Sequence, residues 1–348
     1  MNLNIINIVL LITLLAACSN STEPPINEIK DPRKYTWTID TLEYPEEFQT
    51  GLRSIWGSSP SDVYAVGHCS DADGQMWHFD GKQWTSFHIP FGVAYTPGRV
   101  YGFGKNDIWI GGDFSDNNST ISAFLIHYNG STWNRVNLPD SGLGIESILG
   151  VGPNDVWFGG TNGTLLHWDG TSISKEPLPI KIPYNADPFY NFISIAGNNT
   201  TGKYFFVRSP EYRSYLLRYF QNNYTIIDSN SWYRQKLWVS EKGNIYQAGE
   251  LGFYKWNGSG WDNLLPDQFI TTAGIAATSE NNIFIVGRKS DNGIVYHYNG
   301  NDFFLYENLQ IPYLSLFDAW TDGKEVFILG VNYFDLNSTL KTIILHGK

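Results

Sequence analysis

The hexapeptide DVYAVG at Asp62–Gly67 recurs as DIWIGG at Asp107–Gly112 and as DVWFGG at Asp155–Gly160. Four weaker copies follow along the chain, and they begin at Lys203, Asn244, Asn282 and Glu325. Successive copies start 45, 48, 48, 41, 38 and 43 residues apart. A short apolar segment that returns at this interval predicts one supersecondary unit repeated seven times.

A second landmark follows every hexapeptide except the last, and it consists of an aromatic residue before a turn. It reads FDGKQW, YNGSTW, WDGTSI, YFQNNY, WNGSGW and YNGNDF, with the first ring at Phe79, Tyr128, Trp168, Tyr219, Trp256 and Tyr298. Five of the six copies contain Asp-Gly or Asn-Gly, a pair that favours a two-residue hairpin turn because both residues tolerate positive φ. Each unit therefore reads as four short strands. One four-stranded sheet per ~40–50 residues is typical of a β-propeller.

The two ends of the chain predict the number of blades and the way in which the ring closes. The seventh unit stops at Leu345–Lys348, where its hairpin turn and last strand are due. The segment Tyr35–Thr38 resembles the strand that opens at Trp84 in the first unit. We therefore predict an all-β fold, a seven-bladed β-propeller of four-stranded antiparallel blades over residues 34–348. Its last blade is closed by the N-terminal strand.

The composition excludes several other classes of protein. The chain has 348 residues, of which 16% are charged and 16% are aromatic, and its net charge is −11. Disordered and coiled-coil chains carry more charge and fewer aromatic rings. Lys and Arg form no cluster along the chain, so a nucleic-acid partner is not expected.

The first 33 residues are predicted to direct and tether the protein rather than to join the fold. Ile5–Ala17 is an uncharged run that is too short to span a bilayer, which needs about 20 residues. It ends in LAAC at residues 15–18, which resembles the signal of bacterial lipoproteins. That resemblance implies removal of residues 1–17, acylation of Cys18 and a flexible tether over residues 18–33, and Ser19 implies sorting to the outer membrane. The alternative is an ordinary secretory signal with a chance Cys.

The repeat itself resembles a known group of propellers. The pairs Gly111-Gly112 and Gly159-Gly160, followed by Tyr128 and Trp133 or their equivalents, are similar to kelch repeats, although two blades alone have the pair. The order of DVYAVG, HYNG and Trp resembles bacterial envelope lipoproteins with kelch-like or Asp-box-like propellers. This resemblance implies the fold and a place in the cell envelope. It implies no activity, because propellers include enzymes, receptors and scaffolds.

Five histidines occupy one position of the repeat, and Arg218 and Lys255 take it in the other two blades. The five are His78, His127, His167, His297 and His346. Equivalent positions lie on different blades, so these side chains cannot share one ion, and Arg or Lys in their place indicates a hydrogen-bond donor. We predict no metal site at the histidines. The Asp or Asn that opens a hexapeptide, such as Asp62, is expected to hold a turn by bonding to its own backbone.

Two acidic loops are weak candidates for calcium binding, and one cysteine is a weak candidate for a disulfide bond. Asp71-Ala72-Asp73-Gly74 and Asp113–Asn117 present oxygen atoms of the kind that calcium prefers, but neither loop supplies six to eight ligands on its own. Solvated loop charge is the favoured interpretation, with structural calcium as the alternative and no other cofactor expected. If Cys18 is acylated, Cys69 has no disulfide partner, and we interpret it as a passive, partly buried side chain.

Binding is expected where the repeat is irregular. In a propeller, the loops from the second to the third strand and from the fourth strand to the next blade share one face, and here those loops are long and rich in rings and charge. Exposed rings beside Arg suit stacking on sugars or anchoring of a peptide. The residues predicted to bind are Tyr95, Tyr190, Tyr212, Arg213, Trp232, Tyr233, Arg288, Tyr313 and Tyr333. The alternative is that many of these rings pack between blades.

These observations predict a lipid-anchored protein of the cell envelope, in the outer membrane, that binds or scaffolds glycan or protein ligands through its loop-rich face. Its N-terminal lipid contacts the membrane. The alternative is a carbohydrate-active enzyme, a glycoside hydrolase or lyase, with a carboxylate pair over the central channel. The candidates for that pair are Asp71, Asp73, Asp113, Asp187, Glu211, Glu250, Asp291 and Asp335.

Overall fold

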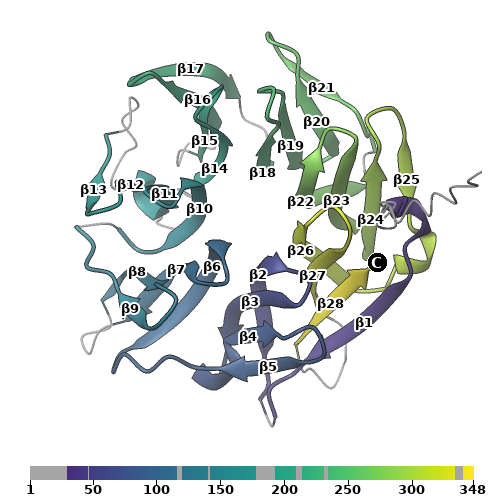
Figure 1. Cartoon of the computed structure of the whole chain (residues 1–348). Helices are drawn as coiled ribbons and strands as arrows, with labels where there is room; N and C mark the ends of the chain where they lie inside the picture. The colour runs from purple at the N-terminus through teal and green to yellow at the C-terminus, as the bar shows by residue number, and fades with distance from the viewer. Residues whose placement is uncertain are drawn as a thin grey trace, which may run out of the picture.

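The computed structural model describes residues 30–45, 47–115, 120–139, 142–177, 193–208, 214–230, 234–267, 269–333 and 340–348. Seven four-stranded sheets stand around a central axis as the blades of a propeller (Figure 1). Within each blade, neighbouring strands pair antiparallel. The predicted all-β, seven-bladed architecture is confirmed.

Six blades each take four strands that are consecutive in the chain, with the innermost strand first. Blade 1 contains β2 (Thr50–Ser59), β3 (Asp62–Cys69), β4 (Met76–Phe79) and β5 (Trp84–Phe87), and blade 2 contains β6 (Ala94–Gly104), β7 (Asp107–Ser115), β8 (Ile121–Tyr128) and β9 (Trp133–Arg135). Blade 3 contains β10 (Ile145–Gly152), β11 (Asp155–Gly160), β12 (Leu165–Trp168) and β13 (Ile173–Lys175), and blade 4 contains β14 (Ile193–Asn198), β15 (Gly202–Arg208), β16 (Ser214–Phe220) and β17 (Asn223–Asn230). Blade 5 contains β18 (Arg234–Val239), β19 (Ile245–Gly249), β20 (Gly252–Trp256) and β21 (Trp261–Asn263), and blade 6 contains β22 (Ile270–Ser279), β23 (Asn282–Lys289), β24 (Asn292–Tyr298) and β25 (Phe303–Leu305). Four short 3₁₀ turns complete the described elements: η1 (Pro32–Lys34), η2 (Ala72–Gly74), η3 (Thr161–Gly163) and η5 (Glu307–Leu309).

Blade 7 joins the two ends of the chain. It contains β26 (Leu314–Thr321), β27 (Val326–Asn332) and β28 (Lys341–Gly347), and β1 (Trp37–Leu42) supplies its outer strand. β1 and β28 pair from Trp37 opposite Gly347 to Leu42 opposite Thr342. The indole of Trp37 also packs edge-on against Tyr306 of blade 6, with 5.0 Å between the ring centroids. The N-terminal strand therefore completes the last blade, as the sequence predicts.

The Asp-Gly and Asn-Gly pairs form the hairpin turns between third and fourth strands. The Asp80 carboxylate accepts hydrogen bonds from the backbone N–H groups two and three residues further on, each at 2.9 Å. Gly81 then adopts φ 91°, in the left-handed region that favours Gly. Blade 4 lacks the pair and uses Gln221 and Asn222, at φ 50° and 62°. The same side-chain bonds recur at Asn129, Asp169, Asn257 and Asn299.

Apolar cores fill the spaces between neighbouring blades. The second strands carry much of this surface, and in β23 the side chains from Ile283 to Val286 have no measurable exposure. A continuous apolar run, rather than alternation, is what a strand covered on both faces requires. Rings reach from blade to blade, as where Trp109 meets Phe158 at 5.3 Å between centroids. Stacking around the ring thus buries sheet faces that a single blade would leave in water.

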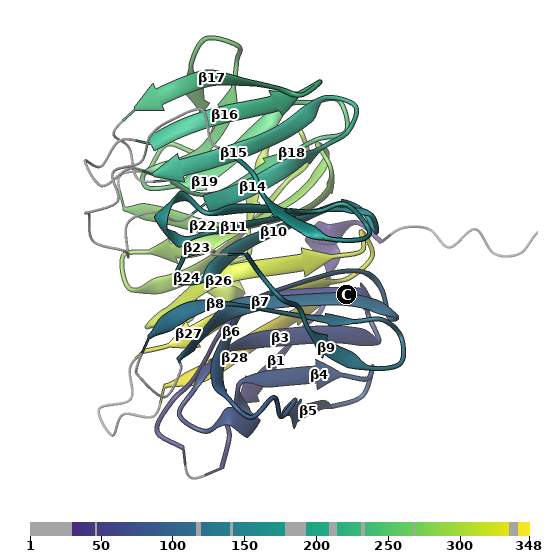
Figure 2. The same cartoon turned by 90° about the vertical axis from the view of Figure 1, so that its left-hand side faces the viewer.

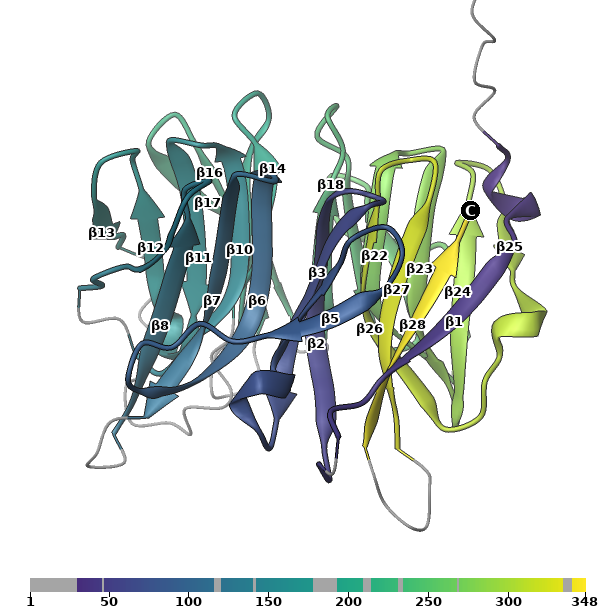
Figure 3. The same ribbon diagram turned by 60° about the horizontal axis from the view of Figure 1, so that its bottom comes forward.

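The two faces of the ring carry different connections. We call turn face the one with the links between first and second strands and between third and fourth strands, and loop-rich face the opposite one. Figure 2 shows the strands running from one face to the other. Lys30 and Lys348 lie together on the turn face, where the Lys30 Nζ donates to the Lys348 carbonyl at 2.8 Å, and β1 runs from there toward the loop-rich face (Figure 3).

Candidate binding site

A channel of about 1000 Å³ runs along the axis of the ring. Its wall consists mainly of the innermost strands β2, β6, β10, β14, β18, β22 and β26. These strands begin at the loop-rich face, so Gln49 and His68 belong to the mouth on that face, whereas Trp56, Trp238 and Trp320 lie further toward the turn face. Gln49 and His68 therefore place polar groups at the loop-rich mouth, and three indole rings line the channel beyond it.

A β-bulge at one repeat position shapes the channel wall. In six of the seven described innermost strands, the register of pairing with the second strand shifts at this position. In β2 the shift lies between Leu52 and Ser54 and leaves Arg53 as the extra residue. Bulges re-aim side chains, and the extra residues Arg53, Glu146 and Phe317 all line the channel. Nothing in the sequence pattern marks these bulges.

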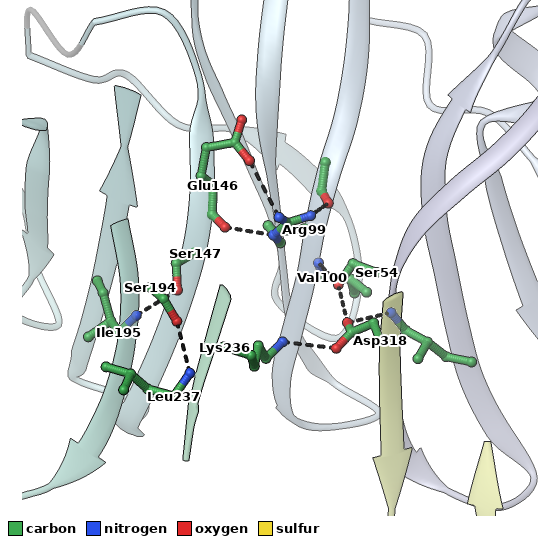
Figure 4. Close-up of polar contacts among 12 residues, drawn as sticks. Ser54, Arg99, Val100, Glu146, Ser147, Ser194, Ile195, Lys236, Leu237 and Asp318 are labelled. Carbon is green, nitrogen blue, oxygen red and sulfur yellow. Dashed lines mark hydrogen bonds and ion pairs between the residues drawn. The ribbon is translucent and has the colours of Figure 1, made fainter. Parts of the chain in front are cut away.

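Described side chains at the repeat position after the bulge bond five of the seven blades to the next one. The hydroxyl of Ser54 accepts a hydrogen bond from the backbone N–H of Val100 at 3.3 Å, and the Asp318 carboxylate accepts one from the N–H of Ile55 at 3.2 Å. Ser147 and Ser194 accept from the next blade in the same way, at 3.0 and 3.3 Å (Figure 4). The seven equivalent residues are Ser54, Arg99, Ser147, Ser194, Lys236, Gly274 and Asp318.

Two ion pairs lie in the channel wall, and sequence reasoning missed both. The Lys236 Nζ of blade 5 lies 2.9 Å from an Asp318 oxygen of blade 7 (Figure 4). Between them, at the same repeat position of blade 6, stands Gly274, which has no side chain to intervene. Arg99 donates from Nε to the Glu146 carbonyl at 2.6 Å, and its terminal nitrogen lies 3.4 Å from the Glu146 carboxylate. The two described carboxylates that line the channel are thus each held by a cation.

One carboxyl near this wall has a shifted proton affinity. Burial, together with the negative charge of Glu146, raises the pKa of Asp113, and Arg53 acts in the opposite direction. Asp113 follows the buried part of β7 and belongs to the carboxylates that the sequence analysis singled out. It does not line the channel or the smaller hollow described next.

Three of the predicted binding residues come together on the loop-rich face. Arg288, Tyr313 and Tyr333 line a hollow of about 410 Å³, with Asp291 and Ser315. The Tyr313 and Tyr333 side chains are 44% and 56% exposed, and Arg288 is exposed as well. These residues come from blades 6 and 7, which the sequence alone could not place side by side.

The other predicted site residues are not part of this hollow. Tyr95 is buried, stacks on Phe124 at 4.4 Å between centroids, and donates from its hydroxyl to the Ile89 carbonyl at 2.8 Å. Its ring packs inside the fold, which was the alternative interpretation of these rings. The remaining predictions lie outside the described residues: Tyr190, Tyr212, Arg213, Trp232, Tyr233 and the acylation site Cys18.

The exposed large apolar side chains also gather on the loop-rich face. Nine such side chains are exposed in the described part of the chain. Six belong to loops or strand starts of the loop-rich face: Phe48, Ile121, Leu251, Phe269, Tyr313 and Tyr333. The other three, Ile39, Ile226 and Phe304, lie on outermost strands.

The repeated histidines hold strands together. His78 lies 2.7 Å from the Asp62 carboxylate across the pair of second and third strands, and His127 and His167 bond to Asp107 and Asp155 in the same way. Asp62 also accepts from the Ser58 hydroxyl. The expectation that Asp62 bonds to its own backbone is therefore wrong, because its carboxylate is hydrogen-bonded to the His78 ring and the Ser58 hydroxyl instead.

No group of three or more His, Cys, Asp or Glu side chains in the described residues could hold a metal ion. Asp71 accepts a hydrogen bond from the Asp73 N–H at 2.8 Å and caps η2. Asp116 and Asn117 of the second acidic loop lie outside the described residues. Cys69 is a free thiol and is buried. Among the described helices, none has the length and apolar character that crossing a bilayer requires.

No protein-family model matches the chain, and no curated protein matches it in sequence. Solved structures do match. YCF48 bound to D1 peptide superposes with a TM-score of 0.62 at 13% identity, over 89% of this chain and 96% of that chain. U3-55K gives a TM-score of 0.59 at 9% identity, over 88% and 98% of the two chains. A GH74 enzyme of Niastella koreensis gives 0.54 at 14% identity, over 85% of this chain and 54% of the enzyme. At these identities the likeness shows the propeller fold alone.

Proposed function

We propose that this chain is a binding module of the cell envelope that holds a protein partner on its loop-rich face. The observation that carries the proposal is that six of the nine exposed large apolar side chains of the described residues lie on that face. Apolar side chains that gather on one surface beside polar groups are typical of an interaction site. The channel mouth and the hollow beside Tyr333 give the same face concave shape.

A protein partner is favoured over a glycan by the kind of side chain exposed. Ile121 and Leu251 are aliphatic, and they suit the apolar side chains of a protein better than the faces of sugar rings. Phe48 and Phe269 add large anchors, which interfaces use at their centres. The YCF48 structure, which has the same fold, holds a D1 peptide, and this supports a polypeptide ligand here.

The position of the tether is consistent with this use of the face. We propose that Cys18 is acylated, as the lipoprotein-like LAAC sequence implies, and that the chain is anchored in the outer membrane. The described chain enters the fold at Lys30 on the turn face, beside Lys348. An anchor attached from that side leaves the loop-rich face directed away from the membrane.

The test compares two pairs of substitutions with the same chemistry. Phe48→Ser with Phe269→Ser removes apolar side chains from the loop-rich face, and Ile39→Ser with Ile226→Ser removes equally exposed ones from the outermost strands. Cross-linking to the partner in intact cells should fall by about tenfold or more in the first pair, the loss of one or two anchor residues. It should stay unchanged in the second pair. Equal cross-linking by both pairs would contradict the proposal.

A glycoside hydrolase is the second candidate, and one pair of groups favours it. Asp113 has a raised pKa, whereas Glu146 beside it is held by Arg99, and carboxyl groups with unlike environments are what acid and base roles require. Two observations argue against an enzyme. Glu146 is already paired with Arg99, and Asp113 does not line the channel. Incubation of the purified protein with labelled envelope oligosaccharides tests it. Cleavage that disappears in Asp113→Asn would replace the binding proposal.

A further inference from the structure

Two arginines near the channel mouth have no ion-pair partner among the residues that the structure describes. Arg53 is the extra residue of the bulge in β2, Arg288 lies near the end of β23, and both side chains are exposed. Neither makes an ion pair, a hydrogen bond or a ring contact with any residue that the structure describes. In contrast, Arg33 pairs with Asp302 and Arg99 with Glu146. Within the described part of the chain, neither guanidinium group is therefore neutralised by an ion pair, although the charge of Arg53 acts on Asp113.

Tyr333 connects the two arginines. It lines the channel together with Arg53 and lines the hollow together with Arg288. Burial raises the pKa of Tyr333, while the charges of Arg53 and Arg288 both oppose that shift, so both guanidinium groups act on the same phenol. Blades 1, 6 and 7 therefore each contribute one polar side chain to one place on the loop-rich face.

Backbone hydrogen bonds fix the loops that carry these groups. The Tyr333 N–H donates to the Tyr313 carbonyl at 3.0 Å, and the Tyr313 N–H donates to the Asp291 carbonyl at 2.6 Å. Phe317 packs edge-on against Tyr333, with centroids 6.5 Å apart. The backbone at Tyr313 and Tyr333 is therefore fixed before any ligand arrives, which lowers the entropy cost of binding.

We propose that Arg53, Arg288 and Tyr333 bind a carboxylate group of an acidic polypeptide. The inference rests on the proposed function and names the chemistry of the partner. A guanidinium group offers a planar pair of donors that fits a carboxylate, and the Tyr hydroxyl is a further donor. The exposed rings of Tyr313 and Tyr333 contact the apolar part of the same ligand.

Asp291 selects between kinds of anion. It lines the same hollow and adds a negative charge, which repels an inorganic polyanion. A peptide instead supplies N–H groups beside its carboxylates, and Asp291 can accept hydrogen bonds from them. The whole chain has a net charge of −11, so recognition of an acidic ligand depends on these short-range contacts rather than on long-range attraction.

The test uses labelled synthetic peptides and purified full-length protein. One short peptide alternates Glu with Leu and Tyr, and its counterpart has Gln in place of every Glu. We expect the Glu peptide to bind at least about tenfold more tightly than the Gln peptide in fluorescence anisotropy. The double variant Arg53→Gln, Arg288→Gln should lose that preference. The matched control Lys82→Gln, Lys324→Gln removes the same charge from exposed positions on the turn face and should keep it.

Each possible result of these measurements supports or overturns one part of the proposal. Equal binding of the Glu and Gln peptides, no binding of either, or an unchanged preference in the double arginine variant would overturn the carboxylate site. Tighter binding of a galacturonate oligosaccharide or of inorganic phosphate than of the Glu peptide would overturn the choice of a polypeptide. Cross-linking of the cellular partner is measured on the same variants. If the arginine variant keeps its partner while Phe48→Ser with Phe269→Ser loses it, the binding function stands and the carboxylate site fails.

Discussion

The turn face and the loop-rich face use left-handed backbone conformations differently. In five hairpin turns of the turn face, Gly is the residue with a left-handed φ, as at Gly300 with φ 90°. In the hairpin turn of blade 4, Gln221 and Asn222 adopt this conformation instead. On the loop-rich face, Gly92, Gly142 and Gly163 also adopt positive φ, but Leu251, Ser290 and Tyr313 do so with a side chain, at φ values of 66°, 51° and 59°. A residue with a Cβ in this region costs roughly 1–2 kcal/mol relative to Gly.

This difference indicates what each face is for. Backbone strain in native proteins concentrates where a side chain is needed for function. Leu251 and Tyr313 are both exposed, so neither side chain is buried in a core between blades. Five of the six described hairpin turns between third and fourth strands on the turn face have Gly in this conformation, and blade 4 has Gln221-Asn222 instead. The loop-rich face keeps three side chains at a cost in backbone strain, which fits the binding role proposed for it.

The largest effect on stability is expected from removing β1, the strand that closes the ring and begins at the turn face. Deletion of Lys34–Leu42 removes β1, its ladder with β28 and the buried side chains of Tyr35 and Leu42. The free energy of unfolding should fall by more than about 5 kcal/mol, beyond most single substitutions. The exposed edge of β28 should also promote aggregation, which size-exclusion chromatography detects. A truncated protein that still unfolds cooperatively within ~2 kcal/mol of the parent would disprove closure by this strand.

A smaller but clear loss is expected at the blade-to-blade bonds of the channel. Asp318→Ala removes the acceptor of Ser54, of the Ile55 N–H and of Lys236. Because the N–H of Ile55 would stay buried without a partner, we expect a loss of about 2–4 kcal/mol in denaturant unfolding. Ser54→Ala keeps the ion pair with Lys236 but leaves the buried N–H of Val100 without its acceptor, so it should cost about 1–3 kcal/mol. Equal losses in the two variants would mean that the ion pair contributes nothing.

The sequence predicts the blades because the features that define them are local. The ring of Phe79, the turn at Asp80 and the strand at Trp84 lie within a few residues of one another, and the same order returns in each unit. The closure was also predictable, because Trp37 repeats a landmark that the seventh unit lacks.

The channel was not predictable, because its contacts join distant residues at a repeat position that varies. Lys236 and Asp318 are 82 residues apart and occupy equivalent positions with opposite charges. An alignment of the repeats therefore shows no pattern there. The position of Tyr95 was equally hidden, since the linker that carries Ile89 folds over it and its hydroxyl bonds back to that linker.

A pH-dependent effect is expected from the hydrogen bonds between second and third strands near the turn face. Burial acts to raise the pKa of Asp155, but hydrogen bonds from His167 and Trp157 and the charge of Lys203 lower it well below its usual value. A pKa lower in the folded state than the unfolded value of about 3.9 stabilises the fold above that pH. This stabilisation is lost as the pH falls below about 4.

Asp155→Asn should therefore destabilise the protein at neutral pH and flatten the decline of its melting temperature between about pH 5 and pH 2. The exposed Asp262→Asn serves as control and should keep the parent's decline. The measurement is a series of thermal melts across this pH range. If Asp155→Asn declines as steeply as the parent, the carboxylate is not part of the acid sensitivity.

The smallest effect on stability is expected from substitution of Tyr313. This substitution tests most directly whether the strained side chains of the loop-rich face serve binding. Tyr313→Gly relieves a φ of 59° and removes a ring that is 44% exposed. Stability should stay constant or rise by up to about 1 kcal/mol, whereas Tyr313→Ala keeps the backbone cost. Binding of the Glu peptide should weaken about five- to hundredfold in both variants, as on loss of an anchoring ring.

The matched substitution on the turn face, Gly300→Ala, should lower stability and leave peptide binding unchanged. Gly300 adopts φ 90°, and a Cβ there would lie 2.2 Å from the Asn281 side-chain oxygen, so Gly300→Ala should cost about 1 kcal/mol or more without affecting peptide binding. Paired melting and anisotropy measurements on Tyr313→Gly and Gly300→Ala separate the two roles. If Tyr313→Gly loses stability and keeps affinity, its ring is a structural element. The strain on the loop-rich face would then have no link to binding.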